Sequence, residues 1–314
     1  MAACVDSSRN HATHHTASCS GTNPLCKIIT RFCKPSTPNL DSSRFLNPHA
    51  YYKKVNDPRR VNPEEYSEDL IWPKIREEAA FDIRQEPMLS KFYHSTILSH
   101  TSLERALANH LALKLCNANI SREALCDVFL KALLEDAEIQ SAMRYDLKAV
   151  RERDPACVSY VHCFLNFKGF LACQAYRLAH KFWIQGRKVL AFLIQNQVSE
   201  VFAMDIHPGA KIGPGIVFDH GTGVVIGETT VIGKDVTIFH NVTLGGTGKA
   251  EGDRHPKIGN GVLVGAGAKV LGNVRIGDQA KIGAGSLVLK EVPPKATAVG
   301  NPARTVGSRR AHTE

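Results

Sequence analysis

The chain has 314 residues, of which 43% are apolar, so it is long enough for one large domain or two ordinary ones. Its formal charge is +9, but residues 1–60 hold nine Lys and Arg against three Asp and Glu, so +6 of that excess lies at the N-terminus. The rest is close to neutral and has neither a basic helix face nor an RNA-binding aromatic motif, which argues against a nucleic-acid partner. No apolar run approaches the ~18 residues that a membrane-spanning helix needs, so we expect no membrane partner either.

Residues 1–67 are predicted to be a disordered tail followed by a linker. Residues 1–40 contain ten Ser and Thr, four Lys and Arg and one acidic residue, Asp6, with no continuous apolar segment. A Ser-rich, acid-poor N-terminus is typical of an organellar transit peptide, and an ordinary disordered tail has a similar composition. We therefore expect a chloroplast or plastid location, with the cytosol and the mitochondrion as alternatives.

Residues 68–204 show the periodicity of helices. In SLERALANHLALKL the apolar residues recur at spacings of three and four. Ser121 precedes REALCDVFLKALL and is an expected N-cap. Asp154 followed by Pro155 is a helix-start signal, a cap and then a proline at the first helical position. The segment predicts an all-helical domain.

Five of the nine cysteines lie in this helical segment, in apolar surroundings: Cys116, Cys126, Cys157, Cys163 and Cys173. The sequence contains no CxxC, which excludes the usual zinc-ribbon and thioredoxin spacings. We expect these cysteines to be buried and reduced, as suits a reducing compartment.

Residues 205–300 have a different period, in which an aliphatic or aromatic residue recurs every six positions and is often followed by glycine. The series is Ile206, Ile212, Phe218, then Ile226, Ile232, Ile238, Leu244, then Ile258, Val264, Val270, Ile276, Ile282, Val288. A fixed short period of this kind indicates a solenoid. Three six-residue units would close one triangular coil of about 18 residues, with the recurring residue inside. Residues 301–314 are expected to form a short C-terminal tail.

The rhythm slips by two residues within IVFDHGTGVVIGE, and a longer break follows Leu244. Asp219 and His220 stand side by side at the slip. We expect the extra residues to turn His220 out of the packed coil.

The motifs RDPA, DIHPGAKIG, DHGTGVVIGET, TLGGTGK, GDRHPKIG and GNPAR resemble those of the serine O-acetyltransferases, most closely the plant form, from about Ile71 to Gly307. The resemblance implies an N-terminal helical domain followed by a left-handed parallel β-helix. It also implies transfer of an acetyl group from acetyl-CoA to the hydroxyl of L-serine, the first step of cysteine biosynthesis from serine, with no metal.

A serine hydroxyl needs a base within hydrogen-bond reach to become a nucleophile. His220 is the natural candidate. Asp205 precedes it by slightly less than one coil, so we expect the carboxylate to stack near His220 and hold one ring nitrogen. The pair also matches the His–Asp dyad of the family.

The zwitterionic substrate needs an anion site and a cation site. A guanidinium fork suits a carboxylate, and the resemblance assigns Arg254 and His255 of GDRHP to that group. It assigns Asp154 and Asp219 to the ammonium group and places Glu228 in the active site.

Acetyl-CoA is expected along an edge of the coil, where small residues let the pantetheine run against the backbone. The resemblance suggests Gly246, Ala266 and Ala284 as contacts, and Lys249 near the phosphates.

Other interpretations remain open. Another hexapeptide acyltransferase, acting on sugars or antibiotics, would not need an Arg–His carboxylate site. A γ-type carbonic anhydrase binds zinc through coil histidines with an H-x₄-H pair, whereas His207, His220 and His240 are spaced by 13 and 20.

The resemblance also implies partners. One coil domain alone leaves the serine site half-built, so we expect homotrimers through the coils, with a dimer of trimers suggested by the family. L-cysteine is expected as a feedback inhibitor. The family binds O-acetylserine (thiol) lyase through a tail ending in isoleucine, whereas this sequence ends in VGSRRAHTE, which puts that partner in doubt.

Overall fold

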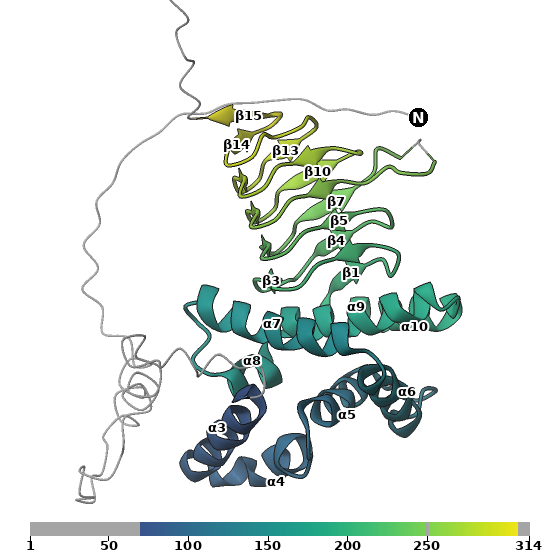
Figure 1. Ribbon diagram of the computed structural model, residues 1–314, viewed down its shortest axis with the longest axis vertical. Coiled ribbons are helices and arrows are strands. Elements are labelled where there is room, and N and C mark those ends of the chain that lie inside the picture. Colours follow the sequence, from purple (N-terminus) through teal and green to yellow (C-terminus); the bar gives the residue numbers. More distant parts are fainter. Residues whose placement is uncertain (1–69, 249–250, 307–314) are drawn as a thin grey trace, which may run out of the picture. The chain divides into compact units, whose positions relative to one another are not determined.

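The computed structural model describes residues 70–248 and 251–306, so the predicted tail of residues 1–67 lies outside the described part. Its N-terminal half is helical (Figure 1). The helices are α3 (Ile71–Gln85), the 3₁₀ turn η4 (Pro87–Leu89), α4 (Ser90–Tyr93), the π turn η5 (His94–Leu98), α5 (Leu103–Leu115), α6 (Arg122–Leu134), α7 (Ala137–Arg153), α8 (Tyr160–Asn166), α9 (Lys168–Ile184) and α10 (Lys188–Phe202). None of the helices described is long and apolar enough to cross a membrane.

Side-chain caps begin four of these helices, because their first amides have no partner within the helix. The caps are Ser102 of α5, Ser121 of α6, Asp136 of α7 and Ser159 of α8, each accepting the amide hydrogen three residues on at 3.0–3.4 Å. Ser121 is therefore confirmed as an N-cap. The prediction that Asp154 starts a helix is wrong. Asp154 is the C-cap of α7, and α8 begins only at Tyr160.

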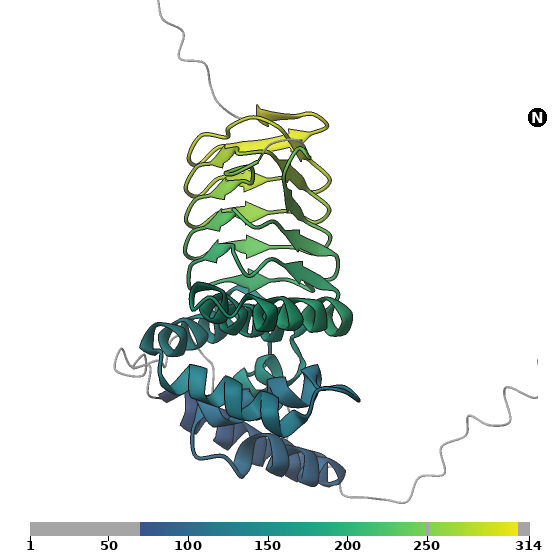
Figure 2. The same ribbon diagram turned by 90° about the vertical axis from the view of Figure 1, so that its right-hand side faces the viewer.

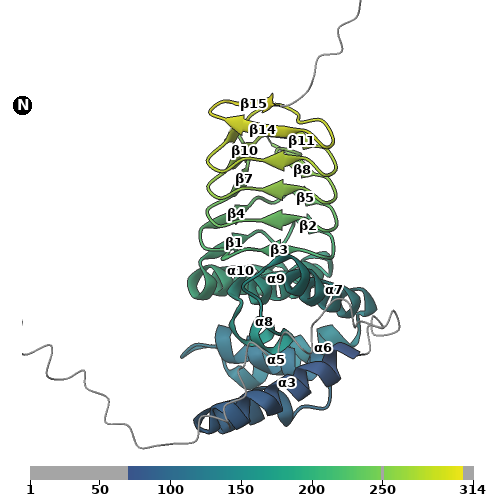
Figure 3. The same cartoon turned by 90° about the vertical axis from the view of Figure 1, so that its left-hand side faces the viewer.

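The second half is a parallel β-helix, whose three faces are built from short strands stacked coil upon coil (Figures 2 and 3). The strands are β1 (Met204–Ile206), β2 (Lys211–Ile212), β3 (Val217–Phe218), β4 (Val224–Ile226), β5 (Val231–Ile232), β6 (Thr237–Ile238), β7 (Thr243–Gly245), β8 (Lys257–Ile258), β9 (Leu263–Val264), β10 (Lys269–Leu271), β11 (Arg275–Ile276), β12 (Lys281–Ile282), β13 (Leu287–Val288), β14 (Thr297–Gly300) and β15 (Ala303–Val306). The faces are β1-β4-β7-β10-β13, β2-β5-β8-β11 and β3-β6-β9-β12-β14, with β15 antiparallel to β14 at the end. The helical segment followed by hexapeptide coils is the fold class expected from the sequence.

The recurring aliphatic residues fill the interior of the coils. Ile232, Ile238 and Leu244 are 2% exposed or less, because the side chains of a strand alternate between the interior and the surface. The residue two positions before each of them is buried as well. Burying each such side chain stabilises the fold by about 1.5–3 kcal/mol. The residues that recur with the six-residue period therefore line the interior of the solenoid.

The strand register shows what the slip and the break do. In a late, regular coil Lys269 pairs with Leu287. Met204 pairs with Val224, so the first coil is longer than the regular one by two residues. The coil after it is longer by eight, since Val231 pairs with Lys257. The slip widens one corner of the first coil, and the longer break inserts a loop at another corner.

A buried ion pair holds α7 and α9 to the first coil. Arg177 of α9 and Asp146 of α7 lie 2.8 Å apart (Nη2 to Oδ2), and the carboxylate also accepts the amide hydrogens of Gly215 at 2.8 Å and Ile216 at 3.0 Å. Arg153, the last residue of α7, donates to the carbonyl of Asp235 at 2.6 Å in the next coil. These polar contacts therefore connect α7 and α9 to the first two coils.

Two expectations from the sequence need correction here. Cys157, Cys163 and Cys173 are buried and free as predicted, but Cys116 and Cys126 are only half-buried and pack against the edge of the core. Part of the predicted tail of residues 301–314 is also structured, as strand β15.

Candidate active site

The widened corner of the first coil consists of residues 219–223, between β3 and β4, and is called the His220 corner. His220 has a φ of 57°, and its side chain is 78% exposed. Histidine is among the residues that tolerate this left-handed conformation. The Nε2 atom lies 3.6 Å from Oδ1 of Asp219, and the ring meets that of His240, one coil on, edge to face at 5.9 Å. The slip thus presents His220 to solvent beside a carboxylate.

Asp205 is not stacked on His220 in the strand register. It pairs with Val225, because the slip lengthens the first coil beyond a regular one. Its Oδ1 accepts a hydrogen bond of 2.6 Å from Nε2 of Gln195 on α10, a residue that carries no sequence signal of its own. The spacing along the chain was therefore a poor guide to stacking, and the role of Asp205 stays a prediction.

Asp154 lies on the connection between α7 and α8, where its Oδ1 accepts the amide hydrogen of Ala156 at 2.8 Å. The carboxylate is close enough to His162 to act on its pKa, and the His162 ring contacts the Phe167 ring at 4.9 Å. The residue after Phe167, Lys168, donates from its ammonium group to the hydroxyl of Thr222 in the His220 corner. Asp154 is therefore linked to the His220 corner only indirectly, through the segment that carries His162, Phe167 and Lys168.

A second polar group lies at the corner between β4 and β5. It comprises residues 227–229 and the loop residues 253–255, and is called the Arg254 corner. Arg254 donates from Nη2 to Oε2 of Glu228 at 2.8 Å, and this bond is the main reason why the pKa of Glu228 is lowered. Burial lowers the pKa of His255, with Arg254 as the next cause, and both favour the neutral form of the ring. The corner offers a guanidinium and an uncharged imidazole.

The ring of His255 lies against the backbone of Gly227. A Cβ atom at Gly227 would come within 2.1 Å of two ring atoms, which is far inside van der Waals contact. His207 also belongs to this corner, because Glu228 and Arg254 both act on its pKa, and it packs edge-on against Trp183 at 5.1 Å. Close packing therefore sets the position of both rings.

The predicted acetyl-CoA contacts divide between the two corners. Ala266 and Ala284 continue the column of the His220 corner, since Gly267 donates to the carbonyl of His240 and Gly285 to that of Ala266. Gly246 lies instead in the inserted loop, where an added Cβ would be 3.5 Å from Cγ of Arg254. Lys249 lies outside the described residues.

The two corners lie at opposite edges of one face, separated by β4. Residues 221–227 rise about 3.3 Å each when extended, so the corners are on the order of 15–20 Å apart. One serine molecule cannot span that distance. Within one chain the structure thus brings His220 together with Asp219, and Glu228 together with Arg254 and His255, but it does not join the two groups.

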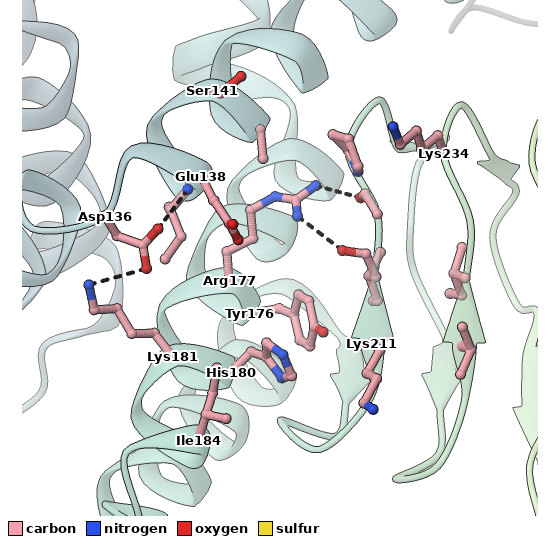
Figure 4. Close-up of a pocket in the computed structure, with 17 residues that line it drawn as sticks. Asp136, Glu138, Ser141, Tyr176, Arg177, His180, Lys181, Ile184, Lys211 and Lys234 are labelled. Carbon is pink, nitrogen blue, oxygen red and sulfur yellow. Dashed lines mark hydrogen bonds and ion pairs between the residues drawn. The ribbon is translucent and has the colours of Figure 1, made fainter.

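An open cavity of about 740 Å³ lies elsewhere, between α7, α9 and strands β2 and β5 (Figure 4). Two basic side chains that line the cavity already form ion pairs, Arg177 with Asp146 and Lys181 with Asp136 at 3.2 Å. None of the predicted site residues lines it. Over the described residues, no group of three His, Cys, Asp or Glu side chains is placed to hold a metal ion.

Stacked hexapeptide coils place the protein in the class of hexapeptide-repeat proteins, and residues 255–290 match the family model "Bacterial transferase hexapeptide (six repeats)". Residues 71–175 match the model "Serine acetyltransferase, N-terminal". The chain belongs to the serine acetyltransferase family.

Two relatives from Arabidopsis thaliana support this conclusion. "Serine acetyltransferase 1, chloroplastic" is 56% identical over 281 residues, which cover 88% of this chain and 89% of the relative. "Serine acetyltransferase 3, mitochondrial" is 61% identical over 241 residues, or 77% of this chain and 62% of the relative. The chain thus spans less than two thirds of the length of the mitochondrial relative.

Solved structures agree. The structure "Soybean Serine Acetyltransferase Complexed with Serine" is 59% identical, covers 77% of this chain and 100% of that one, and has a TM-score of 0.75. A serine acetyltransferase from Brucella abortus in complex with coenzyme A is 46% identical over 79% of this chain and 97% of that one, with a TM-score of 0.74. A third, "Serine Acetyltransferase- Complex with Cysteine", is 51% identical over 76% of this chain and 98% of that one, with a TM-score of 0.74.

Proposed function

We propose that this chain is a serine O-acetyltransferase that transfers the acetyl group of acetyl-CoA to L-serine, giving O-acetyl-L-serine and CoA. The observation that carries the mechanism is His220, held exposed beside Asp219 at the one corner that the slip widens. Family membership supplies the reaction class, and the solved relatives named as complexes with serine and with coenzyme A support the two substrates.

In the proposed mechanism His220 acts as general base. It takes the proton of the serine hydroxyl as the oxygen attacks the thioester carbonyl. The tetrahedral intermediate then expels the CoA sulfur, which recovers the proton from the imidazolium. Asp205, fixed by Gln195, is the proposed partner that orients the ring and stabilises its charged form.

The ion sites of serine are assigned by charge. Asp219 and Asp154 suit the ammonium group, and Arg254 with the neutral ring of His255 suits the carboxylate. Glu228 keeps the guanidinium in place through its 2.8 Å contact. CoA is proposed to follow the column of Ala266 and Ala284 with Gly246 opposite, and Lys249 near its phosphates.

Two corners that are too far apart within one chain require a second copy. Coils packed side by side would bring the His220 corner of one copy to the Arg254 corner of the next, and heterologous contacts of this kind close into a ring. The three-sided coil and the resemblance to the family favour a ring of three. We infer a homotrimer, or a dimer of trimers. Analytical ultracentrifugation checks it: a fully active monomer at assay concentration would contradict a shared site.

Regulation and location follow the same family logic. L-cysteine, which is named as the ligand of one solved relative, is proposed to compete at the serine site. A plastid location is proposed because one relative is chloroplastic, although another is mitochondrial. Fusing residues 1–60 to a fluorescent reporter tests this, and a diffuse cytosolic signal would refute it. Co-purification with O-acetylserine (thiol) lyase tests that partner.

The activity is tested by CoA release from acetyl-CoA with L-serine. His220→Ala should lower kcat by about 10²–10⁴-fold, the usual contribution of a general base. His94→Ala, an exposed histidine in η5, is the control and should keep full activity. A His220→Ala enzyme that retains near wild-type turnover would overturn the mechanism. A wild-type enzyme that ignores serine but acetylates a sugar would overturn the substrate.

A further inference from the structure

Thr229 lies at the centre of the Arg254 corner and has no role in any of the steps above. Its hydroxyl oxygen accepts the backbone amide hydrogens of Arg254 and of His255, both at 3.1 Å. The two amides belong to the inserted loop, whereas Thr229 belongs to the coil that precedes it. One hydroxyl therefore fastens the loop to the coil at the two residues that carry the anion site.

The same residue fixes the imidazole of His255. The backbone N–H of Thr229 lies 3.2 Å from Nδ1 of the ring, and the hydroxyl oxygen lies 2.9 Å from it. A backbone N–H can only donate, so Nδ1 accepts and carries no proton. The neutral ring must therefore hold its hydrogen on Nε2, the ring atom that lies beside Gly227 and Gly246.

Further contacts restrict the ring and the loop from other sides. The ring lies against Gly227, where even a methyl group would collide with it. The carbonyl of Thr229 accepts from Nζ of Lys257 at 2.7 Å, and the same ammonium group donates to the carbonyl of His255 at 2.9 Å. The charged groups that act on the His255 ring are Arg254, Glu228, Lys257 and His207.

We propose that Thr229 is a positioning residue for serine binding, which holds the backbone of Arg254 and His255 and selects the tautomer in which Nε2–H of His255 faces the substrate carboxylate. The proposal rests on the assignment of Arg254 and His255 to that carboxylate. Thr229 itself touches no reacting atom. Its removal should weaken the binding of serine and leave the base and the acetyl-CoA column unchanged.

The next residue provides a matched control. Thr230 is 0% exposed, and its hydroxyl oxygen has no hydrogen-bond partner among the described residues. Thr229→Val and Thr230→Val thus make the same chemical change at adjacent positions. Thr229→Val leaves two backbone amides of the loop without their acceptor. Thr230→Val removes a hydroxyl that binds nothing within the described part of the chain.

The test measures KM for serine, kcat, KM for acetyl-CoA and the Kd of serine by calorimetry, on the full chain. Thr229→Val should raise KM and Kd for serine about 10–100-fold, the effect of leaving one or two amides unpaired. The other two constants should change less than about threefold, since the hydroxyl of Thr229 fastens the loop only at Arg254 and His255 and touches neither His220 nor the column of Ala266 and Ala284. Thr229→Ser should restore most of the affinity, and Thr230→Val should behave as wild type. Thr229→Ala replaces Thr229→Val if the latter does not fold.

Two outcomes separate the possible errors. If His255→Ala leaves the Kd of serine unchanged, the carboxylate site is wrongly assigned and the role of Thr229 falls with it. If His255→Ala weakens serine binding but Thr229→Val does not, the carboxylate site stands and Thr229 is no positioning residue. Equal losses in Thr229→Val and Thr230→Val would also overturn the proposal, since they would report general damage to the coil.

Discussion

The buried pair Asp146–Arg177 offers the sharpest test of how the helices are joined to the coils. Asp146 is 0% exposed, and its two oxygens accept from five nitrogen donors: Nε and Nη2 of Arg177, Nε2 of Gln174, and the amides of Gly215 and Ile216. Asp146→Asn keeps the shape, but it removes the charge and turns one acceptor into a donor. The carboxamide then faces at least one donor with its own NH₂ group.

The magnitude follows from these contacts. Breaking a buried ion pair from one side costs about 3–5 kcal/mol, because the remaining charge is left without compensation. An unpaired amide adds about 1–3 kcal/mol. Against a typical total stability of about 5–15 kcal/mol, the loss of about 4 kcal/mol or more is severe. Replacing both partners, in Asp146→Leu/Arg177→Met, should recover part of it, since no buried charge remains.

Urea unfolding followed by circular dichroism measures these differences. Asp127→Asn, at an exposed position on α6, is the control and should change the free energy of unfolding by less than about 0.5 kcal/mol. The reasoning is refuted if Asp146→Asn costs less than about 1 kcal/mol, or if the double variant is as unstable as the sum of the two single ones.

Three further predictions concern single side chains. Burial raises the pKa of Glu78 from 4.5 to about 7. As the pH rises between these values the unfolded chain loses this proton before the folded one does, so the free energy of unfolding falls by up to about 3 kcal/mol, since each pH unit between the two pKa values is worth about 1.36 kcal/mol. Glu78→Gln should abolish that fall and be the more stable protein at pH 8 in urea titrations; parallel pH curves would contradict the assignment. Gln195→Leu removes the donor to Asp205 and should lower kcat about tenfold with KM for serine little changed; an unaltered kcat means that Gln195 does not orient Asp205. Gly227→Ala would collide with the ring of His255 and should raise KM for serine more than about tenfold, whereas an unchanged KM would show that the ring can move aside.

Much of the fold was predictable, because a six-residue period is a direct image of which side chains point inward. The series from Ile206 to Val288 marks the strands, and both irregularities in it mark corners where proposed site residues lie. The register of the paired strands was harder to predict from the sequence. The same slip that exposes His220 lengthens its coil and moves Asp205 opposite Val225, which a uniform coil length misses.

Other parts of the site depend on tertiary contacts that leave no pattern in the sequence. Pro155 signals a helix start, yet α7 runs on to Arg153, whose guanidinium binds carbonyls of the coils, and Asp154 closes that helix. Gln195 and Thr229 are single polar residues in a helix and a turn. Gln195 finds its partner only because the fold brings Asp205 to it, and Thr229 only because the inserted loop folds back onto its coil.

The left-handed backbone of His220 has a consequence for the evolution of this corner. A side chain in that conformation costs on the order of 1–2 kcal/mol that glycine would not, so the coil is less stable than its own geometry allows. Selection for stability alone would replace this histidine with glycine and would also lose the proposed base. The corner is thus a site where thermostability and turnover are in direct conflict, and a thermostable variant is best sought elsewhere in the chain.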